Sequence, residues 1–506
     1  MLKTNLTMDP TPRNPAGPRP SAARSCLAGA FLLAAAGCAV GPDYRRPEVA
    51  APAAFKEDAQ WRVAAPEDAA PRGPWWEVFN DPVLNALEST VEASNLTVAQ
   101  AAANYEEARQ IARADRTGYL PAVGATGSAV RSRSPQAQGV PGRGLTSSNY
   151  TAELQASWEP DFWGRLRRTV EADVATAQAD AATLAAARLS TQGTLAQDYI
   201  ALRASDDQVR LLENAVAAYR RTVSIAQNKY SVGVVARSDV ITAQTQLDST
   251  RAQLIGAGVQ RAQLEHAIAV LLGKAPSDFS IARRPELGLA VPQVPAQLPS
   301  SLLERRPDVA AAEREAAAAN AKIGIQTAAY FPSFSISGAA GYEGSPLHAL
   351  LTAPYRFWTV GAQATDALLD WGQRHDVVRS ARAAYDAAAA GYRQTVLTSL
   401  QQVEDNLAEL RILNAEAQVQ DHAVSEAAEA AQIALNEYNA GTVDFTTVAT
   451  AQVTELANRE TALSINAAQL ASSAALIQAL GGGWKSADLP NAGSVLSRQK
   501  ETSIGK

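Results

Sequence analysis

The sequence predicts a mainly α-helical protein with a membrane β-barrel, built from a tandem duplication within one chain. Three observations lead to this fold class. Two short stretches alternate between apolar and polar residues over the length of a tilted membrane strand. Two much longer stretches contain no proline and are rich in alanine and long polar residues, which favour helix. Strong sequence landmarks also recur at one fixed offset between the two halves of the chain.

The clearest strand signal lies in residues 149–159. The apolar face is Tyr150, Ala152, Leu154, Ala156 and Trp158, and the polar face is Thr151, Glu153, Gln155, Ser157 and Glu159. Strict alternation is typical of a strand between two different environments. Aromatic residues at both ends of the apolar face indicate anchors at two membrane interfaces. Residues 357–365 repeat the pattern, with Trp358 and Val360 on the apolar face.

Two weaker strand signals, 123–129 and 334–342, each precede one of the stronger strands. Glycine and other small residues dominate the first, and serines alternate with apolar residues in the second. Polar segments with glycine and proline separate the members of each pair, at 131–148 and 344–354, and are expected to be exposed loops. The sequence therefore predicts two β-hairpins.

The duplication rests on landmarks that keep their spacing. They are Trp163-Gly164 with Trp371-Gly372, Tyr230 and Gly233 with Tyr438 and Gly441, and Leu272-Gly273 with Leu480-Gly481. The offset is the same for each, as in 371 − 163 = 208. An earlier landmark, Tyr119-Leu120-Pro121, matches Tyr330-Phe331-Pro332 at 330 − 119 = 211, because the second hairpin loop is shorter. Two alanine-rich helices that matched by composition alone would not hold one offset over such a length.

Each half contains one very long helical stretch. Residues 165–230 number 230 − 165 + 1 = 66, with one glycine and no proline. A helix of that length is about 100 Å long, which exceeds what a compact domain accommodates. Residues 374–438 form the matching stretch. Such lengths indicate a coiled coil or a barrel of helices. Return helices are expected up to Leu272, with Ser238 or Asp239 as the N-cap, and at 446–480.

These signals divide the chain into six parts. They are a signal peptide (1–37), an N-terminal tether (38–80), a first structural repeat (81–274), a connector (275–300), a second repeat (301–483) and a C-terminal tail (484–506). The tether and the connector are rich in proline, and the polar tail is expected to be mobile. Shorter helices are predicted at about 83–94, 98–116 and 305–328.

Composition excludes some classes of function. The net charge of −6 argues against a nucleic-acid partner. After the signal segment no run of 18 apolar residues occurs, so no membrane-spanning helix is predicted. The four histidines are scattered, and no catalytic or metal-binding motif occurs. We therefore expect neither an enzyme nor a cofactor.

The amino terminus carries a targeting signal. Basic residues precede a short apolar run that ends in Ala35-Ala36-Gly37-Cys38, which resembles a bacterial lipoprotein box. In that motif Cys38 receives a covalent lipid and becomes the mature amino terminus, and the residue after it, here Ala39, directs the protein to the outer membrane. Cleavage by an ordinary signal peptidase is the alternative, and Met8 is an alternative start.

Four membrane strands in one chain are not sufficient for a membrane structure. In hydrocarbon every backbone N–H and C=O group needs a partner, and an open sheet has two bare edges. The smallest spanning barrels use about eight strands. Copies of the chain must therefore supply the missing strands: two copies give eight and three give twelve. The long helices need partners for the same reason.

Specific motifs add a family resemblance. They are Cys38 to Pro47 (CAVGPDYRRP), the Trp-Gly-Arg and Trp-Gly-Gln-Arg corners, Leu302 to Asp308 (LLERRPD) and Ala329 to Pro332 (AYFP). The chain resembles the outer-membrane channel lipoproteins of tripartite efflux systems, the NodT type of the TolC-like family. The resemblance covers about residues 38–481.

The resemblance implies a homotrimer with a twelve-stranded β-barrel in the outer membrane and a twelve-helix periplasmic α-barrel. A mixed equatorial belt would come from the connector and the C-terminal region. The protein would be the passive exit duct for small molecules, lipid-anchored in the bacterial outer membrane, with a periplasmic adaptor and a proton-driven inner-membrane pump as partners.

The resemblance also implies a gate at the two helical turns. Tyr438 matches the family's gate tyrosine, and Asp239 matches an aspartate that follows the first turn. Further charges of the family are absent at Val443, Thr447 and Thr450, and Asp444 and Arg237 are candidates to replace them. The hypothesis is a closed ring of Tyr438, Asp239, Asp444 and Arg237 in the resting trimer. Asp239 as a simple helix cap remains the alternative. Gly233 and Gly441 are expected to be turn glycines and adaptor contacts.

Two other functions fit parts of the pattern. A type I protein-secretion outer-membrane channel shares the resembled fold, but the lipoprotein box and the GPDYRRP segment favour efflux. A purely structural coiled-coil lipoprotein would leave the four alternating strands unexplained. The exported compound, whether a drug, a metal ion or a solvent, has no signature in the sequence.

Overall fold

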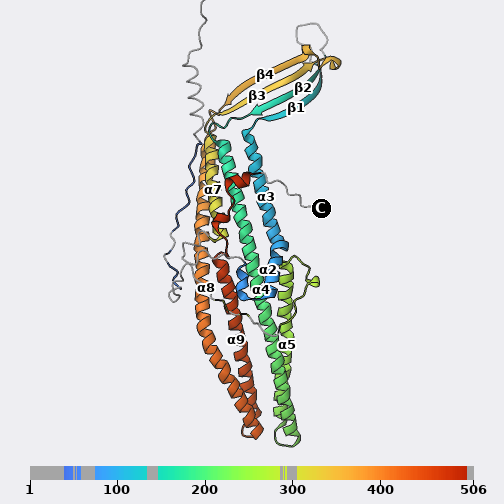
Figure 1. The fold of residues 1–506 in the computed structure, drawn as a ribbon, viewed down its shortest axis with the longest axis vertical. Helices are drawn as coiled ribbons and strands as arrows, with labels where there is room; N and C mark the ends of the chain where they lie inside the picture. The colour runs from blue at the N-terminus through green and yellow to red at the C-terminus, as the bar shows by residue number, and fades with distance from the viewer. Residues whose placement is uncertain are drawn as a thin grey trace, which may run out of the picture. The chain divides into compact units, whose positions relative to one another are not determined.

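The structure is a computed structural model of the chain. It describes residues 39–49, 52, 54–57, 74–133, 146–284, 289, 291–292 and 305–497. The predicted signal peptide and the predicted lipidation site, Cys38, lie outside the described residues. The chain divides into a β unit, made of residues 39–41, 118–168 and 324–374 in its described part, and a helical unit made of the rest (Figure 1).

The β unit contains one four-stranded antiparallel sheet in the order β1-β2-β3-β4. The strands are β1 Ala122–Arg133, β2 Thr146–Trp158, β3 Ser333–Gly344 and β4 Arg356–Thr365. The four predicted strands are confirmed. The first hairpin loop is shorter than predicted, because Arg131, Ser132 and Arg133 still pair with β2. Backbone ladder bonds do not depend on the side chain, so this polar segment continues the strand.

The strand registers repeat the offsets seen in the sequence. Ala122 pairs with Ser157 in the first hairpin, and Ser333 pairs with Thr365 in the second. The differences are 333 − 122 = 211 and 365 − 157 = 208, the two offsets of the duplication. The two hairpins are therefore built in the same register.

The sheet is open on both faces and at both edges. No residue of the four strands is buried. Because Leu154 pairs with Ala125 and with Ala340, one face carries the apolar series that the alternation predicted. The opposite face carries Thr151, Glu153 and Gln155. Within the described part of the chain, β1 and β4 each have a neighbouring strand on one side only.

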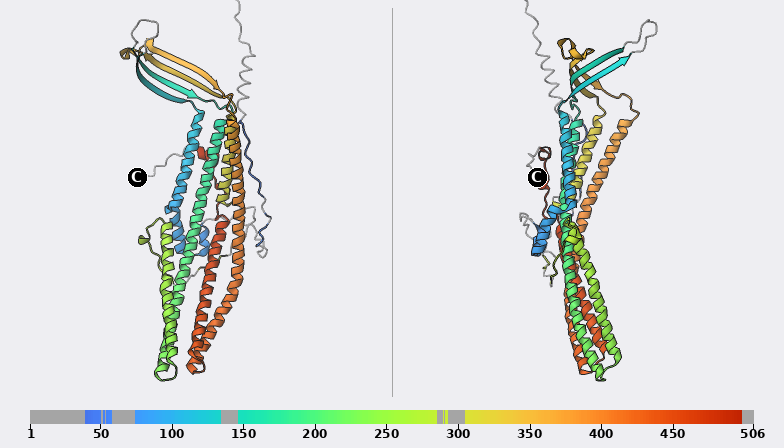
Figure 2. Two further views of the ribbon diagram at one scale, coloured as in Figure 1. Left: turned by 180° about the vertical axis from the view of Figure 1, so that it is seen from behind. Right: turned by 90° about the vertical axis from the view of Figure 1, so that its right-hand side faces the viewer.

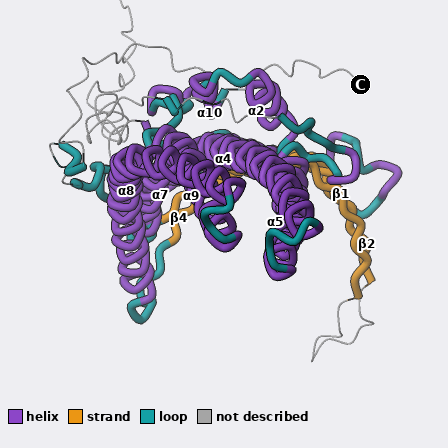
Figure 3. The backbone as a smooth tube through the Cα atoms, turned by 90° about the horizontal axis from the view of Figure 1, so that it is seen from below, coloured by secondary structure: helices purple, strands orange, loops and turns teal. Residues whose placement is uncertain are grey.

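The helical unit consists of one curved layer of helices, with shorter segments on its convex side (Figures 2 and 3). The main helices are α2 Pro82–Ser94, α3 Leu96–Arg116, α4 Arg165–Ser231, α5 Arg237–Leu271, α7 Pro307–Ala328, α8 Gln373–Ala440 and α9 Phe445–Ala479, followed by the short α10 Ala492–Leu496. Short 3-10 helices include η1 Trp75–Phe79 and η3 Pro276–Asp278. The predicted long helices and return helices are confirmed. None of the described helices is apolar enough over a sufficient length to cross a membrane.

The largest hydrophobic cluster of the helical unit forms around the short helix η1 and the connector. Trp75, Trp76 and Phe79 of η1 pack with residues of α2, α4, α5 and α9. Ile281 and Leu289 of the connector join the same cluster. Apolar residues of this proline-rich segment thus fill the gaps between helices, and their burial fixes its described part on the helical layer.

The N-terminal segment is extended, as predicted, but it is held along its length. The Tyr44 hydroxyl donates to Glu313 Oε1 at 2.7 Å, and Arg46 Nε donates to the Tyr392 hydroxyl at 3.0 Å. Phe55 is 4% exposed in a cluster that includes Leu407. These contacts attach the segment to α7 and α8.

The expectation of a mobile C-terminal tail is wrong for residues 484–497. Val495 of α10 is fully buried, and its carbonyl accepts a hydrogen bond from Arg113 Nε at 3.2 Å. Trp484 and Leu489 pack against Ala182 of α4. Most residues of the tail are polar, but these few apolar side chains are packed against the helices. Removing them from water is favourable and holds the tail in place. Residues 498–506 lie outside the described residues.

Candidate functional site at the helical turns

Both long helices end in the same backbone motif. At the first turn Gly233 N–H donates to the Tyr230 carbonyl at 2.9 Å, and Val234 N–H donates to the Lys229 carbonyl at 2.9 Å. At the second turn Gly441 and Thr442 make the equivalent bonds, at 3.1 and 3.0 Å. This is the Schellman motif, in which a left-handed residue ends a helix. Gly233 has φ 80° and Gly441 has φ 82°, so both glycines have the predicted turn role.

The two return helices begin differently. The Asp444 side chain is the N-cap of α9 and accepts hydrogen bonds from Thr447 N–H and Thr447 Oγ1, each at 3.0 Å. The N-cap of α5 is Ala236, which provides no side-chain bond. The prediction that Ser238 or Asp239 caps α5 is therefore wrong. The helix begins two residues earlier than a Ser238 cap allows, because Arg237 and Ser238 already have helical geometry.

Tyr438 lies in an apolar cluster that joins the two helical hairpins, α4 with α5 and α8 with α9. Its ring is 1% exposed and meets the Phe445 ring edge-on, with centroids 5.5 Å apart. The other buried members are Val216, Tyr219, Val223 and Ala226 of α4, Ala243 and Leu247 of α5, Ala434 of α8 and Val448 of α9. The cluster therefore connects all four helices near the turns, and Tyr438 contributes packing within a single chain.

Lys229 of α4 makes a polar contact with the end of α8, which we call the Lys229 tie. Its Nζ lies 4.5 Å from the centre of the Tyr438 ring and donates to the Tyr438 carbonyl and, at 3.1 Å, to the Asn439 carbonyl. The last carbonyls of a helix lack partners inside the helix and carry partial negative charge. A cation that satisfies two of them and contacts an aromatic face stabilises the α4–α8 contact.

The hydroxyl of Tyr438 is the unsatisfied part of this site. It is buried and has no hydrogen-bond partner within the described residues. Burial raises the pKa of Tyr438, and the negative charge of Asp239 raises that pKa further. Asp239 therefore lies close enough to affect Tyr438, and the hydroxyl stays protonated.

The structure thus brings together only part of the predicted ring within one chain. The negative charge of Asp239, at the start of α5, contributes to the raised pKa of Tyr438 near the end of α8. Asp444 is exposed and its carboxylate is bound to its own helix, and Arg237 is exposed on the first turn of α5. A ring across several copies remains a prediction.

Sequence reasoning missed Lys229. The repeat offset pairs it with Glu437, because 437 − 229 = 208, so the duplication does not mark it as a repeated feature. One signal was present: Lys229 is the basic residue in the last turn of α4, directly before Tyr230. Which partner it binds depends on the packing of the second hairpin.

An open groove of about 590 Å³ lies between α5 and α9 near these turns. Hydroxyl and amide side chains line it, together with the exposed side chains of Ile241 and Val453. Within the part of the chain that the structure describes, no cluster of three or more His, Cys, Asp or Glu residues is arranged to hold a metal ion.

The family model of outer membrane efflux proteins matches residues 87–274 and 298–482 of this chain. The chain belongs to the outer membrane efflux protein family. The two matches fall in the two halves that the duplication relates. The family's role is transport, in the form of the channel component of efflux pumps.

Individual outer membrane efflux proteins are similar over most of the chain. The toluene efflux pump outer membrane protein TtgC of Pseudomonas putida is 30% identical over 459 residues, which are 90% of this chain and 94% of TtgC. The pyoverdine export outer membrane protein OpmQ of Pseudomonas aeruginosa is 27% identical over 435 residues, which are 85% of this chain and 91% of OpmQ. The solved structure of the outer-membrane channel OprN matches with a TM-score of 0.83 at 29% identity, covering 88% of this chain and 100% of that chain.

This outer membrane efflux protein therefore has the TolC-like fold, and it is the outer-membrane channel component of an efflux pump. Its helical part is periplasmic, as in the structures it resembles.

Proposed function

We propose that three copies of this chain form one exit duct, through which small molecules pass passively from a pump–adaptor complex to the exterior. The observation that carries the proposal is the open sheet. In the described part of the chain β1 and β4 each lack a neighbour on one side, and every strand residue is at least partly exposed. Unpaired strand edges are not tolerated in hydrocarbon. Three copies bring twelve strands, which close a barrel around the polar face.

The helical layer supports the same assembly. It is one helix thick along most of its length and curved (Figure 3). Helices in a single layer cannot bury two faces by themselves. Three such layers make a closed tunnel of twelve helical segments, with the shorter elements of the convex side as an outer belt.

The test is the conductance of the purified protein. We expect trimers by light scattering in detergent, and ion conduction after insertion into planar bilayers. A protein that stays monomeric under membrane-like conditions, or trimers that never conduct, would overturn the proposal.

The duct needs two partners, a periplasmic adaptor and an inner-membrane pump. We assign the adaptor contact to the exposed turns around Gly233 and Gly441. Substrate choice belongs to the pump: relatives of similar identity are named for toluene efflux and for pyoverdine export. Crosslinking from these turns in cells, followed by identification of the bound protein, tests the assignment.

Cys38 is the proposed lipid attachment site. A covalently lipidated amino terminus would anchor the segment that Tyr44 and Arg46 attach to the helical unit. Mass spectrometry of the mature protein should show a lipid-modified Cys38, and the Cys38→Ser variant should lack it. An unmodified mature terminus elsewhere would remove this part of the proposal.

The resting duct is proposed to be closed at the tip by ties between the two hairpins of each copy. Lys229 and Tyr438 make the tie inside a copy, and Arg237, Asp239 and Asp444 are the charged residues placed to act between copies. Opening then requires that α8 and α9 move away from α4.

The Lys229→Met variant tests the tie, because methionine keeps the unbranched aliphatic part of the side chain and removes the ammonium group. We expect trimers of normal stability with a several-fold higher resting conductance. The matched control is Lys274→Met: Lys274 also contacts an aromatic ring, Phe279 at 5.6 Å, but it follows the other end of α5. Equal resting conductance in both variants would exclude Lys229 from the gate.

A further inference from the structure

The two end segments of the chain lie on one contact between two helices. We call this contact the alanine seam, because short apolar side chains of α4 and α7 form it. Its buried members are Ala175 and Ala182 of α4 and Ala310, Ala311, Ala317 and Ala318 of α7. Residues seven positions apart share one face of a helix, since seven residues make about two turns. The seam therefore joins the long helix of the first repeat to a helix of the second repeat.

Larger side chains from both end segments cover the seam. Tyr44 of the N-terminal segment packs on the part of the seam that contains Ala175. Trp484 and Leu489 of the C-terminal tail pack on the part that contains Ala182. The helix α10 of the tail lies on the convex side of the helical layer (Figure 3). The two end segments thus cover neighbouring stretches of the same seam.

A series of polar contacts links the two end segments across the seam. The Tyr44 hydroxyl donates to Glu313 Oε1 at 2.7 Å, and the Glu313 carboxylate accepts two bonds from Arg314, at 2.5 and 2.6 Å. Arg314 Nη1 donates to Gln178 Oε1 at 3.4 Å, and Gln178 Nε2 donates to the Pro490 carbonyl at 2.9 Å. The Arg314 guanidinium also lies 5.7 Å from the centre of the Tyr44 ring. These contacts run from one end segment to the other through α7 and α4.

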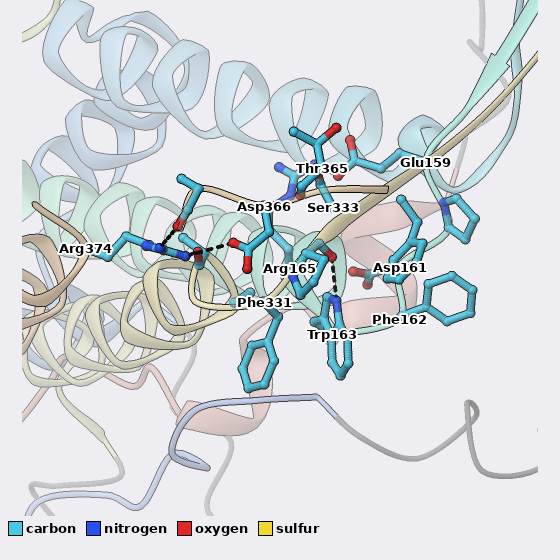
Figure 4. Close-up of a pocket in the computed structure, with 16 residues that line it drawn as sticks. Glu159, Asp161, Phe162, Trp163, Arg165, Phe331, Ser333, Thr365, Asp366 and Arg374 are labelled. Atoms are coloured by element: carbon cyan, nitrogen blue, oxygen red, sulfur yellow. Dashed lines mark hydrogen bonds and ion pairs between the residues drawn. The ribbon is translucent and has the colours of Figure 1, made fainter. Parts of the chain in front are cut away.

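The N-terminal segment is fixed just before it reaches the seam. Its first described residues belong to the β unit, where Val40 N–H donates to the Trp163 carbonyl at 3.1 Å. Trp163 Nε1 donates in turn to the Pro332 carbonyl at 2.8 Å, beside a pocket of about 300 Å³ (Figure 4). In the helical unit Asn320 Nδ2 of α7 donates to the Pro42 carbonyl at 3.0 Å. These bonds determine where the following residues of the segment lie.

The faces of α4 and α7 opposite the seam carry like charges. Asp180 lies two positions before Ala182, and Glu315 lies two positions before Ala317, which is about 200° around each helix. Burial raises the pKa of Asp180, and the negative charges of Glu315 and Glu107 raise that pKa further. Repulsion between like charges opposes the close approach of the helices. The packing on the seam side must therefore outweigh this repulsion.

The seam does not follow from the duplication. The offset of 211 converts Ala317 and Ala318 of α7 into Glu106 and Glu107 of α3, as in 317 − 211 = 106. Carboxylates at these two positions cannot form an apolar seam, because a charged group is costly to bury. The alanine seam is therefore a feature of the contact between the two repeats of one chain.

We propose that the two end segments form one clamp, which holds the alanine seam shut and keeps the tunnel wall from leaking into the periplasm. This inference rests on the proposed trimeric duct and adds a role for the chain ends. A wall that is one helix thick has no second layer behind it. Alanine brings little apolar area to a contact, so the larger side chains of the end segments supply most of the burial at this seam.

Shortening either half of the clamp should open the seam. We expect Tyr44→Ala and Trp484→Ala to form trimers whose resting conductance in planar bilayers is several-fold higher. Tyr44→Phe keeps the ring on the seam and should leak less than Tyr44→Ala. The matched controls are Phe55→Ala and Val495→Ala, which remove buried apolar side chains from the same two segments at other contacts. Both controls should keep the wild-type resting conductance.

A disulfide across the seam distinguishes a leak in the wall from an opened tip. Ala182→Cys is combined with Ala310→Cys in one full-length protein and with Ala311→Cys in another, because these buried residues form one cluster. At least one pair should oxidise within a chain, which mass spectrometry detects. The control pair, Ala182→Cys with Ala318→Cys, is displaced along α7 by about 10 Å and should not oxidise. The disulfide should return the resting conductance of Trp484→Ala to the wild-type level.

Three results would overturn the clamp: normal resting conductance in Tyr44→Ala and Trp484→Ala trimers, an equal rise in the controls, or a rise that the disulfide does not remove. Failure of both seam pairs to oxidise would overturn the seam contact itself. In these cases the duct survives, because trimer formation and conductance of the unmodified protein are measured separately. Absence of trimers in the unmodified protein would instead overturn the duct and the role of the clamp together.

Discussion

Tyr438 shows how one residue can be well packed and yet leave a polar atom unsatisfied. Its ring fills the contact between the two hairpins, and its hydroxyl is buried without a hydrogen-bond partner in the described part of the chain. An unpaired buried hydroxyl is unfavourable, whereas the ring's burial is favourable. The contribution of Tyr438 to the proposed closed tip therefore comes from its ring.

Replacing Tyr438 by phenylalanine should leave the tip closed. We expect unchanged resting conductance and a melting temperature that is equal or slightly higher, because the unpaired hydroxyl is removed. Tyr438→Ala should cost about 3–5 kcal/mol of stability and raise the resting conductance. Bilayer recordings and thermal unfolding of the trimers check both. A leaky Tyr438→Phe channel would show that the hydroxyl has a partner in the assembled duct.

Glu88 is a second residue with an unusual environment. It lies on α2 and is fully buried, and neither carboxylate oxygen has a hydrogen-bond partner among the described residues. Burial raises the pKa of Glu88 to about 9. The folded protein therefore holds a proton that the unfolded chain, with its ordinary pKa of 4.5, releases above that pH.

The sign of the pH dependence follows. The proton on Glu88 stabilises the fold fully below the unfolded pKa, and this contribution is lost as the pH rises toward about 9. The free energy of unfolding of Glu88→Gln should depend less on pH than that of the wild type. Relative to the wild type, it should rise by about 1 kcal/mol per pH unit between about pH 6 and 8. Glu92→Gln, at an exposed position of the same helix, is the control. Denaturation curves at several pH values measure the difference, and parallel curves for all three proteins would contradict it.

Among the helices, the two return helices have different starts although the duplication relates them. α9 has an aspartate N-cap, whereas the N-cap of α5 is Ala236, which provides no side-chain hydrogen bond. Asp239 lies in the first turn of α5, where a negative charge interacts favourably with the helix dipole. Equivalent positions in the repeats have therefore taken different local roles.

This difference predicts unequal effects of removing each aspartate. Asp444→Ala should cost about 1 kcal/mol, because Thr447 N–H loses its acceptor. Asp239→Ala should cost only about 0.3–0.5 kcal/mol through the helix dipole. Amide hydrogen exchange at Thr447 should quicken in the first variant and stay unchanged in the second. Faster exchange in the Asp239 variant would indicate a capping role that the structure does not give it.

In the molecule as a whole, the sheet has two faces of opposite character and no internal core. Leu154 is 60% exposed on one face, and Gln155 is exposed on the other. An apolar face that stays uncovered is favourable only against lipid, and a polar face only against water. In the proposed duct the long helices likewise become a tunnel only after assembly, so the proposed function belongs to the trimer.

Charge placed on the two faces should therefore have opposite outcomes. Leu154→Arg should impair insertion or lower barrel stability by about 2–4 kcal/mol, because the charge faces lipid. Gln155→Arg should insert normally and change the ion selectivity of the channel. Outer-membrane yield and reversal potentials distinguish the cases. Normal insertion of the Leu154 variant with altered selectivity would mean that the faces are reversed.

The features that depend only on residues close together in the sequence could be predicted from the sequence. Alternation predicted the strands, and the absence of proline predicted the long helices. Glycines at fixed spacing predicted the turns and, through the constant offset, the duplication. These features rest on local backbone preferences and on side-chain periodicity, which are present in short windows of sequence.

Which of two equivalent residues is covered could be known only from the folded chain. Trp163 is packed and Trp371 exposed, and Tyr438 is buried while Tyr230 is 47% exposed. The partner of Lys229 and the packing of the tail at Val495 were also set by distant segments. The reason is that burial depends on which surfaces meet, and two repeats with the same local sequence have different neighbours in a single chain.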